Sequence, residues 1–368
     1  MKTIHDLLSF SSTVQKISTG SALEEEHFIQ HKHEESTLEA LLASCLTGRP
    51  LLIVGEPGIG KSQVALAAAH LLQVPYYSYV IDERTDRDDV LFRYDAISRL
   101  GEAQMLGALQ GCGVLQDNNQ NTKGGAEALK EIKELLREDL DPAKFIFPGA
   151  MWWAFDPDGA EKVEREAVAR LGLEYQDEHK SVFQRSYDGF KEDPTDCEVG
   201  SVVLIDEIDK ADISVPNGLL ECLSERQFRV PQINKVVKLK NHKKPPLIIF
   251  TSNRERDLPP AFIRRCVVHN MNTMDEEAER KNFLMDRARA WFDASVIDDK
   301  TVGDCIDRLI ASREKAGEKS LYKPGASEFL DLLRILASDK YSGKAGEQED
   351  VVKSLSKFTF DKYKISES

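Results

Sequence analysis

The sequence lacks both the cysteine spacing of a zinc site and any apolar run of membrane-spanning length. Its six cysteines are scattered over 368 residues without a Cys-x-x-Cys pair. We therefore expect reduced, structural thiols and neither a disulfide framework nor a zinc centre. No apolar run approaches the roughly 20 residues that cross a bilayer. Residues 1–6 carry an early acid and no apolar core, so we expect no secretory signal and a cytoplasmic protein.

Positive charge is also scarce. Lys and Arg number 49 against 63 Asp and Glu, a formal net charge of −14, which argues against a nucleic-acid partner because such binding needs a basic surface. Residues 156–199 hold 13 acids against 6 Lys or Arg, as in a solvated insertion or a partner-facing surface. The local basic run at 235–244 alternates with apolar residues and is expected to be the exposed face of a strand.

The most informative stretch is Gly-Glu-Pro-Gly-Ile-Gly-Lys-Ser at residues 55–62. An apolar run at 51–54 precedes it and a helical pattern at 61–72 follows, which is the context that a phosphate-binding loop needs. Its glycines let backbone N–H groups surround a phosphate at a helix N-terminus. The alternative, a chance glycine-rich turn, does not explain the flanking strand and helix. We predict a nucleoside triphosphate site formed by Gly55, Glu56, Pro57, Gly58, Ile59, Gly60, Lys61 and Ser62.

Two acids follow the apolar strand expected at 201–205. Asp206 can hold Mg²⁺ together with the Ser62 hydroxyl, while Lys61 reaches the β- and γ-phosphates. Glu207 can polarise the attacking water. An ordinary acidic turn is the alternative, but the preceding phosphate loop favours a Walker B motif. The predicted cofactors are ATP and Mg²⁺, with Ser62 and Asp206 as the metal ligands.

Polar residues also follow the next apolar strand, expected at 246–250. Asn253 can hydrogen-bond the γ-phosphate or the attacking water, or it can simply cap a turn. Arg264 and Arg265 come about twelve residues later. An arginine at an exposed helix end suits a finger that reaches a neighbouring copy's phosphate. The alternative is a solvated cation at a helix terminus.

The order of the expected elements divides the chain into three parts. Residues 1–34 are expected to form an N-terminal arm, in which His27, His31 and His33 suit a solvated polar segment better than a metal site. Alternating strands and helices predict an α/β ATPase domain with a parallel sheet over 35–270, including a helix at 37–46 capped by Ser36 and a hairpin at 227–239. Helical patterns predict an all-helical domain over 271–368.

In this order the parts resemble an AAA+ ATPase, and within that superfamily the chain is similar to the MoxR family, in a branch that includes CoxD-like ATPases. The resemblance is carried by VLIDEIDKAD at 203–212, TSNRERDL at 251–258, PAFIRRC at 260–266 and RYDA at 93–96. It spans about residues 35–340, with unmatched stretches near 112–143 and 156–199. It implies a P-loop fold in which helices sandwich a parallel sheet, followed by a small helical lid domain.

The resemblance also assigns roles and partners. It makes Asn253 the sensor 1 residue and Arg265 the arginine finger, with Arg264 as the second candidate. It implies a homo-oligomeric ring, a hexamer, that hydrolyses ATP to remodel a von Willebrand A-domain protein or another client. One position departs from the pattern, because Phe329 stands where many relatives have a lid arginine, and Lys323 is the nearby cation.

Two other functions are compatible with these residues. The first is an ATP-gated assembly scaffold or sensor with slow turnover, which the missing lid arginine and the acidic stretches favour. The second is a nucleic-acid translocase, which depends on the basic run at 235–244 alone and conflicts with the net charge of −14.

Overall fold

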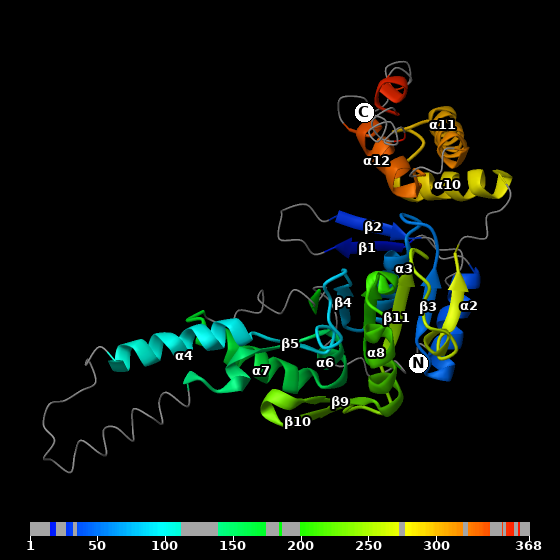
Figure 1. Ribbon diagram of the computed structural model, residues 1–368. Coiled ribbons are helices and arrows are strands. Elements are labelled where there is room, and N and C mark those ends of the chain that lie inside the picture. The colour runs from blue at the N-terminus through cyan, green and yellow to red at the C-terminus, as the bar shows by residue number, and fades with distance from the viewer. Residues whose placement is uncertain are drawn as a thin grey trace, which may run out of the picture.

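The structure is a computed structural model that describes residues 15–19, 27–31, 35–111, 139–173, 184–185, 199–271, 277–318, 323–338, 348, 351–356 and 360. Figure 1 shows an α/β body with a helical projection on one side and a small helical domain above one end. Except for Gly111, which ends a helix, the loop expected over 111–126 and the helix expected over 126–138 lie outside the described residues.

The body is built on a six-stranded sheet in the order β12-β3-β11-β8-β4-β7. Five neighbouring strands are parallel, and β7 joins the edge strand β4 in antiparallel pairing. The strands are β3 (Leu51–Val54), β4 (Tyr76–Val80), β7 (Gln184–Arg185), β8 (Val202–Asp206), β11 (Leu247–Ser252) and β12 (Val267–Asn270). The parallel α/β fold predicted from the sequence is therefore confirmed.

Alternate residues of the central strands point to opposite faces of this sheet, as the two-residue period of a strand requires. Leu51 and Ile53 share a core with α2 (Glu35–Thr47) and α3 (Lys61–Leu72). Leu52 and Val54 belong to the other core, with α6 (Ala150–Phe155) and α8 (Ser214–Glu225). Burial on both faces explains why the first four residues of β3, β8 and β11 are all apolar.

One local prediction was wrong and two were right only in part. Helix α2 begins at Glu35, so Ser36 lies inside it and is not its N-cap. Residues 88–100, expected to be helix or loop, include β5 (Phe92–Tyr94), which pairs with β6 (Ile146–Pro148). The acidic stretch 156–199 is not all solvated insertion, because it begins with α7 (Pro157–Arg170), which buries Ala160, Val163, Glu164 and Ala167.

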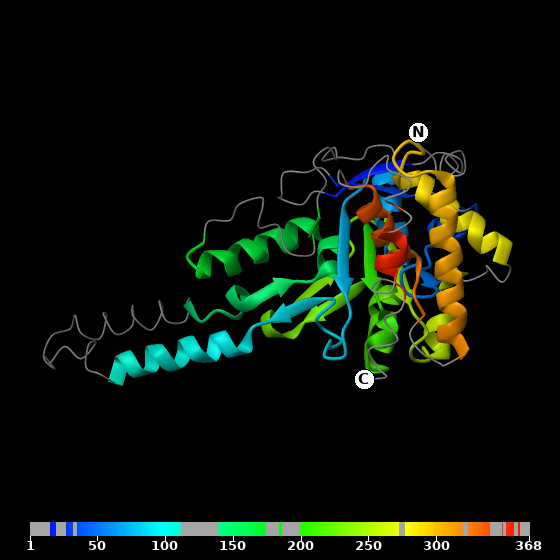
Figure 2. The same cartoon turned by 90° about the horizontal axis from the view of Figure 1, so that it is seen from above.

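Two further elements extend from the sheet. The helix α4 (Ala96–Gly111) projects away from the body in both views (Figure 1, Figure 2). The expected N-terminal arm contains a two-stranded antiparallel ribbon, β1 (Gln15–Thr19) and β2 (His27–His31). This ribbon lies between the body and the helical domain, against α3. The described residues contain no cluster of His, Cys, Asp and Glu that could hold a metal by itself.

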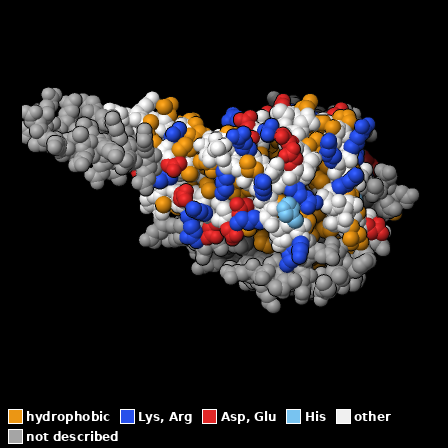
Figure 3. Space-filling model, turned by 90° about the horizontal axis from the view of Figure 1, so that it is seen from below, with side chains coloured by type: hydrophobic (Ala, Val, Ile, Leu, Met, Phe, Trp, Pro, Cys, Tyr) orange, Lys and Arg blue, Asp and Glu red, His pale blue; other side chains and the backbone are white. Residues whose placement is uncertain are grey.

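The predicted hairpin is formed by β9 (Gln227–Val230) and β10 (Lys235–Lys238). Val237 is buried and Lys238 is exposed, as expected for a strand with one solvent-facing side. The prediction holds only in part, because Val236 is also exposed and Lys240, Lys243 and Lys244 lie in the loop that follows the strand. Lys240 also lies 2.8 Å from a carboxylate oxygen of Asp156. Figure 3 shows that basic side chains are interspersed with acidic ones over the face opposite the helical domain.

The C-terminal part is helical, with its own core. After the short helix α9 (Pro260–Ile263), it consists of α10 (Glu277–Trp291), α11 (Asp299–Glu318) and α12 (Ala326–Leu336), with residues 351–356 also helical. Helices were predicted in each of these places. No helix in the described part of the chain is both long and apolar enough to cross a membrane.

A buried histidine makes the edge of the sheet sensitive to pH. His269 of β12 shares a 3.0 Å hydrogen bond with the Thr37 hydroxyl of α2, and burial lowers the pKa of His269 below its usual value of about 6.5. The unfolded chain therefore binds this proton more readily, and stability falls as pH drops below about 6.5, by up to about 1.4 kcal/mol per pH unit. We expect His269→Gln to lose this part of the pH dependence. Urea unfolding of both proteins between pH 5 and 8 measures it; parallel pH profiles would contradict it.

Candidate nucleotide-binding site

The predicted phosphate loop is the turn between β3 and α3. Gly58 and Gly60 have φ angles of 76° and 97°, a left-handed backbone that glycine adopts without steric cost. Helix α3 begins at Lys61, so the loop ends at a helix N-terminus, where unpaired N–H groups and the helix dipole favour an anion. The strand, the loop and the helix predicted for residues 51–72 are therefore all present.

Lys61 lies at the centre of the site, with only 6% of the residue exposed. Its Nζ donates to the carbonyl oxygens of Gly55 and Glu56, both at 2.9 Å, and to Oδ1 of Asn253 at 2.6 Å. Burial lowers the pKa of Lys61, and nearby carboxylates, that of Asp206 most strongly, oppose this shift. Because an ammonium has three N–H groups and all three find acceptors, the position of this cation is fixed.

Oxygen atoms suited to magnesium meet beside this lysine. The Ser62 hydroxyl lies 2.9 and 2.8 Å from the two carboxylate oxygens of Asp206, and the Thr251 hydroxyl donates to the same carboxylate. Mg²⁺ prefers such oxygens and is commonly held by one or two carboxylates together with substrate phosphates. Ser62 and Asp206, from α3 and β8, therefore fit the metal site predicted for them.

Glu207 follows β8 and is hydrogen-bonded through both its backbone N–H and its carboxylate. Its backbone is left-handed, with φ 59° and ψ 45°, and its N–H donates to the Thr251 hydroxyl at 2.9 Å. Its carboxylate accepts from Nδ2 of Asn253 at 3.1 Å and from Nζ of Lys210 at 2.7 Å. Asn253 thus joins Glu207 to Lys61 through one amide. The sequence predicted Glu207 and Asn253 for this site but not Lys210, the partner of Glu207.

Asp209 is a structural member of the site that sequence reasoning did not identify. It is 1% exposed and accepts from the backbone N–H groups of Asn253 at 3.1 Å and Glu255 at 2.8 Å. These bonds fix the turn that carries the Asn253 side chain. An acid two residues after Glu207 is visible in the sequence, but the backbone it serves is 44 and 46 residues away, so local pattern does not reveal the contact.

Three helices of the C-terminal domain, hereafter the lid, contact the loop. Arg287 of α10 donates to the Ile59 carbonyl at 2.6 Å. Arg313 of α11 donates to the Glu56 carboxylate, and the Ser327 hydroxyl of α12 lies 3.4 Å from the Gly58 carbonyl. The cavity between loop and lid measures only about 60 Å³, whereas pockets for small ligands measure about 300–1,000 Å³. In this arrangement of loop and lid, that cavity is therefore too small to hold a nucleotide.

The two lid residues singled out from the sequence do not reach the loop. Phe329 is fully buried among the apolar side chains of the lid. Lys323 is exposed and makes no hydrogen bond or ion pair within the described part of the chain. Arg287 and Arg313 hold the positions next to the loop, and no sequence motif marked them.

Arg264 and Arg265 end the short helix α9, and both are exposed. Arg265 donates to the Ala261 carbonyl at 3.2 Å. Within the described residues, neither arginine bonds to the loop, to Asp206 or to Glu207. They therefore lie outside the site formed by their own chain.

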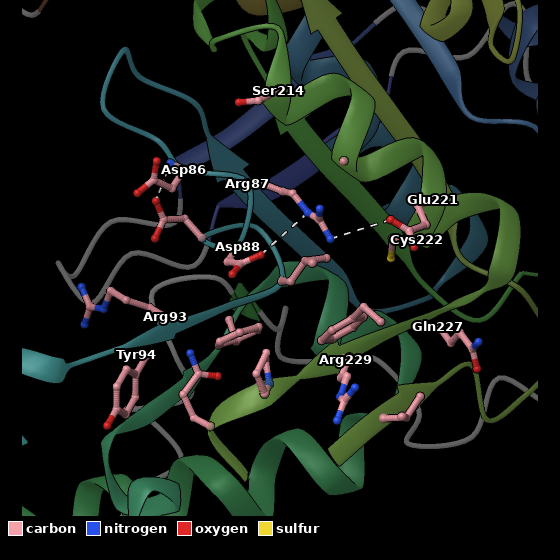
Figure 4. A pocket seen from close by; sticks show the side chains of 18 of the residues that line it. Asp86, Arg87, Asp88, Arg93, Tyr94, Ser214, Glu221, Cys222, Gln227 and Arg229 are labelled. Carbon is pink, nitrogen blue, oxygen red and sulfur yellow. Dashed lines mark hydrogen bonds and ion pairs between the residues drawn. The ribbon is translucent and has the colours of Figure 1, made fainter. Parts of the chain in front are cut away.

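A larger cleft, of about 770 Å³, lies between residues 86–94, α8 and the β9–β10 hairpin (Figure 4). Arg87 reaches across it to Asp88 and Glu221, each at 3.9 Å. These side chains are half exposed or more, so the pairs add little stability. None of the residues predicted for the nucleotide site lines this cleft, which is therefore a separate feature.

The family comparison identifies one domain. Residues 50–115 and 153–266 match the AAA domain (dynein-related subfamily). Most of the first stretch that the sequence left unmatched, near 112–143, falls in the gap between these segments, whereas 156–199 lies inside the second segment. No curated protein matches the sequence.

The solved structures that match this chain are distant in sequence. A putative ATPase from Cytophaga hutchinsonii is 12% identical, with 96% of this chain and 83% of that chain covered and a TM-score of 0.33. A mutant of RuvB from Thermotoga maritima is 13% identical, with 88% and 75% covered and a TM-score of 0.32. The RuvB Holliday junction branch migration motor from the same organism is also 13% identical, with 88% and 74% covered and a TM-score of 0.29.

The buried carboxylate of Asp209 generates a stability prediction. Asp209→Ala leaves two backbone N–H groups without their acceptor, so we expect the free energy of unfolding to fall by about 2–4 kcal/mol. The control is Asp212→Ala, which removes an exposed carboxylate that accepts from the Ser214 N–H at 2.9 Å, and it should cost distinctly less. Denaturant unfolding compares the two, and equal losses would show that Asp209 does not hold the Asn253 turn.

Proposed function

Since residues 50–115 and 153–266 match the AAA domain (dynein-related subfamily), we propose that this protein is a ring-forming ATPase. It binds ATP with Mg²⁺ at residues 55–62, hydrolyses it, and uses the resulting conformational change to remodel or activate a partner protein. One observation carries the proposal. A single amide, that of Asn253, contacts both the loop lysine and the acid placed to activate water, next to the Ser62–Asp206 pair.

Each predicted residue has a task that its contacts support. Lys61 offsets negative charge on the β- and γ-phosphates, and Ser62 and Asp206 hold Mg²⁺. When bound, the metal neutralises charge that develops on the phosphate oxygens. Glu207 orients and polarises the attacking water. Asn253 hydrogen-bonds both Glu207 and Lys61, so the base and the phosphate-binding cation keep a fixed separation.

The proposal of a ring depends on where Arg264 and Arg265 lie, which is outside the site of their own chain. We propose that Arg265, or its neighbour Arg264, completes the site of an adjacent copy, as an arginine finger does. Their exposure and the lack of a described contact with their own site support this role. On this reading one copy is an incomplete enzyme, and a hexamer is the assembly that the resemblance implies.

Two more specific proposals concern the branch of the family and the client protein. We propose that the chain is MoxR-like, in the CoxD-like branch, and acts as a chaperone on a von Willebrand A-domain protein or another client. The stretches at 203–212, 251–258 and 260–266 support that branch. Cys222, Cys266 and Cys305 are buried free thiols, which suit a reducing compartment such as the cytoplasm.

A scaffold or sensor that turns over slowly is the second candidate. Glu207 is paired with Lys210 at 2.7 Å, and a carboxylate oxygen that is held by a cation is less available to orient the attacking water. Phe329 is committed to the lid core, so the usual coupling of lid to phosphate is absent at that position. Both observations favour slow turnover, whereas the bond between Asn253 and Glu207 favours hydrolysis.

Mixing two inactive variants tests the shared site. We expect Glu207→Gln and Arg265→Ala each to reduce the ATPase rate by at least about 100-fold. In an equimolar mixture, the intact Arg265 of the first variant meets the intact Glu207 of the second, so the rate should rise several-fold above either alone. The wild-type rate per subunit should also rise with protein concentration. A coupled assay of phosphate release measures all of these rates.

The control is Arg334→Ala, which removes an exposed lid arginine paired with Asp331 at 3.0 Å and should keep wild-type activity. If the mixture stays inactive although both variants bind ATP, the finger does not act between copies. A wild-type rate that is low, independent of concentration and unchanged by Glu207→Gln would favour the scaffold.

A further inference from the structure

Arg313 anchors the lid to the phosphate loop. Its guanidinium donates to the Glu56 carboxylate and to the Pro324 carbonyl at 2.6 Å, and its side chain is only 12% exposed. A hydrogen bond between a guanidinium and a carboxylate is about twice as strong as one between neutral groups. This pair therefore joins α11 to the first part of the loop without occupying the glycine turn that follows.

Arg287 lies on that glycine turn. Its Nη2 donates to the Ile59 carbonyl at 2.6 Å. A Cβ placed on Gly60 would lie 2.9 Å from Nη1 and 3.0 Å from Nη2, so the guanidinium rests directly on this glycine. The Phe283 ring, one turn earlier on α10, lies 4.4 Å from the guanidinium carbon and supports it from the other side. Arg287 thus sits over the residue that precedes Lys61.

The partner of Arg287 on the loop is exchangeable. The bond to Ile59 goes to a neutral carbonyl, while a phosphate offers charged oxygens that a guanidinium can bind in a bidentate manner. A phosphate cradled by the loop lies beside Gly60 and Lys61, because the loop's own N–H groups bind it there. It therefore competes with the Ile59 carbonyl for the same guanidinium.

We propose that Arg287 is the lid residue that binds the nucleotide phosphates, an inference that rests on the ATP site proposed above. Without nucleotide, its guanidinium holds the Ile59 carbonyl and keeps the lid closed over a cavity of about 60 Å³. With nucleotide, the lid shifts, the guanidinium moves to the phosphates, and the Arg313–Glu56 pair keeps α11 attached. The lid cation then comes from α10 and not from the start of α12, where Phe329 is buried.

Binding of ATP, ADP and AMP to Arg287→Ala tests this assignment by calorimetry on the full chain. We expect ATP affinity to fall about 10-fold to 100-fold, ADP affinity to fall less, and AMP affinity to change little, because the loss should follow the number of phosphates near the loop. Arg287→Lys keeps the charge and should recover part of the ATP affinity. The control is Lys323→Ala, which should bind all three nucleotides as the wild type does.

The outcomes separate this inference from the proposed function. If the wild type binds ATP, and Lys61→Ala abolishes that binding, the ATP site stands. If Arg287→Ala then binds ATP as the wild type does, or loses ATP, ADP and AMP affinity equally, Arg287 does not contact phosphate and only this inference fails. A wild type that binds no ATP overturns both. If Arg287→Ala does not fold, as judged by its thermal unfolding midpoint, the affinities for ATP, ADP and AMP are compared in Arg287→Lys and Arg287→Gln instead.

Discussion

The buried ammonium of Lys61 is the interaction on which the site depends. A buried charge is costly unless it is fully hydrogen-bonded and balanced. Lys61 is fully hydrogen-bonded by two carbonyls of the loop after β3 and the amide of Asn253 after β11, and nearby carboxylates, that of Asp206 most strongly, balance its charge. These strands are neighbours in the sheet, and the Gly55 N–H donates to the Ser252 carbonyl at 3.1 Å. Sheet pairing therefore sets the distance that the lysine spans.

Three acids lie close enough to the Lys61 ammonium to interact with its charge. Asp206, Glu207 and Asp209 lie within four residues of one another at the end of β8, yet each serves different donors: hydroxyl groups, the Asn253 amide with Lys210, and backbone N–H groups. Three carboxylates this close would repel one another if they were not separately bonded. Committed donors also hold the groups in place before a substrate arrives, which is what electrostatic catalysis requires.

The sequence predicted the parts of the site whose signal is local. β3, β8 and β11 are apolar on both faces, and the loop is recognised by its glycines, so these elements and Lys61, Ser62, Asp206, Glu207 and Asn253 could be identified. β5 and β12 were missed because they are short and only partly buried. Lys210 and Asp209 were quoted within a motif without a role, since their contacts depend on how the turns after β8 and β11 meet. Arg287 and Arg313 depend on how the lid is placed on the loop, and no periodicity in the sequence records that.

The placement of the lid limits how it can respond to the loop. Phe329 fills the core shared by α10, α11 and α12, so this position cannot also supply a charge, and the helices must contact the loop through other residues. The chain leading to α10 leaves the sheet at Met271, whose N–H donates to the carbonyl of Val54 at 2.9 Å. Val54 is the last residue before the loop. A shift of the loop therefore acts directly on α10 through Arg287, and the bond between Met271 and Val54 ties the start of the loop to the end of the sheet strand that precedes the lid.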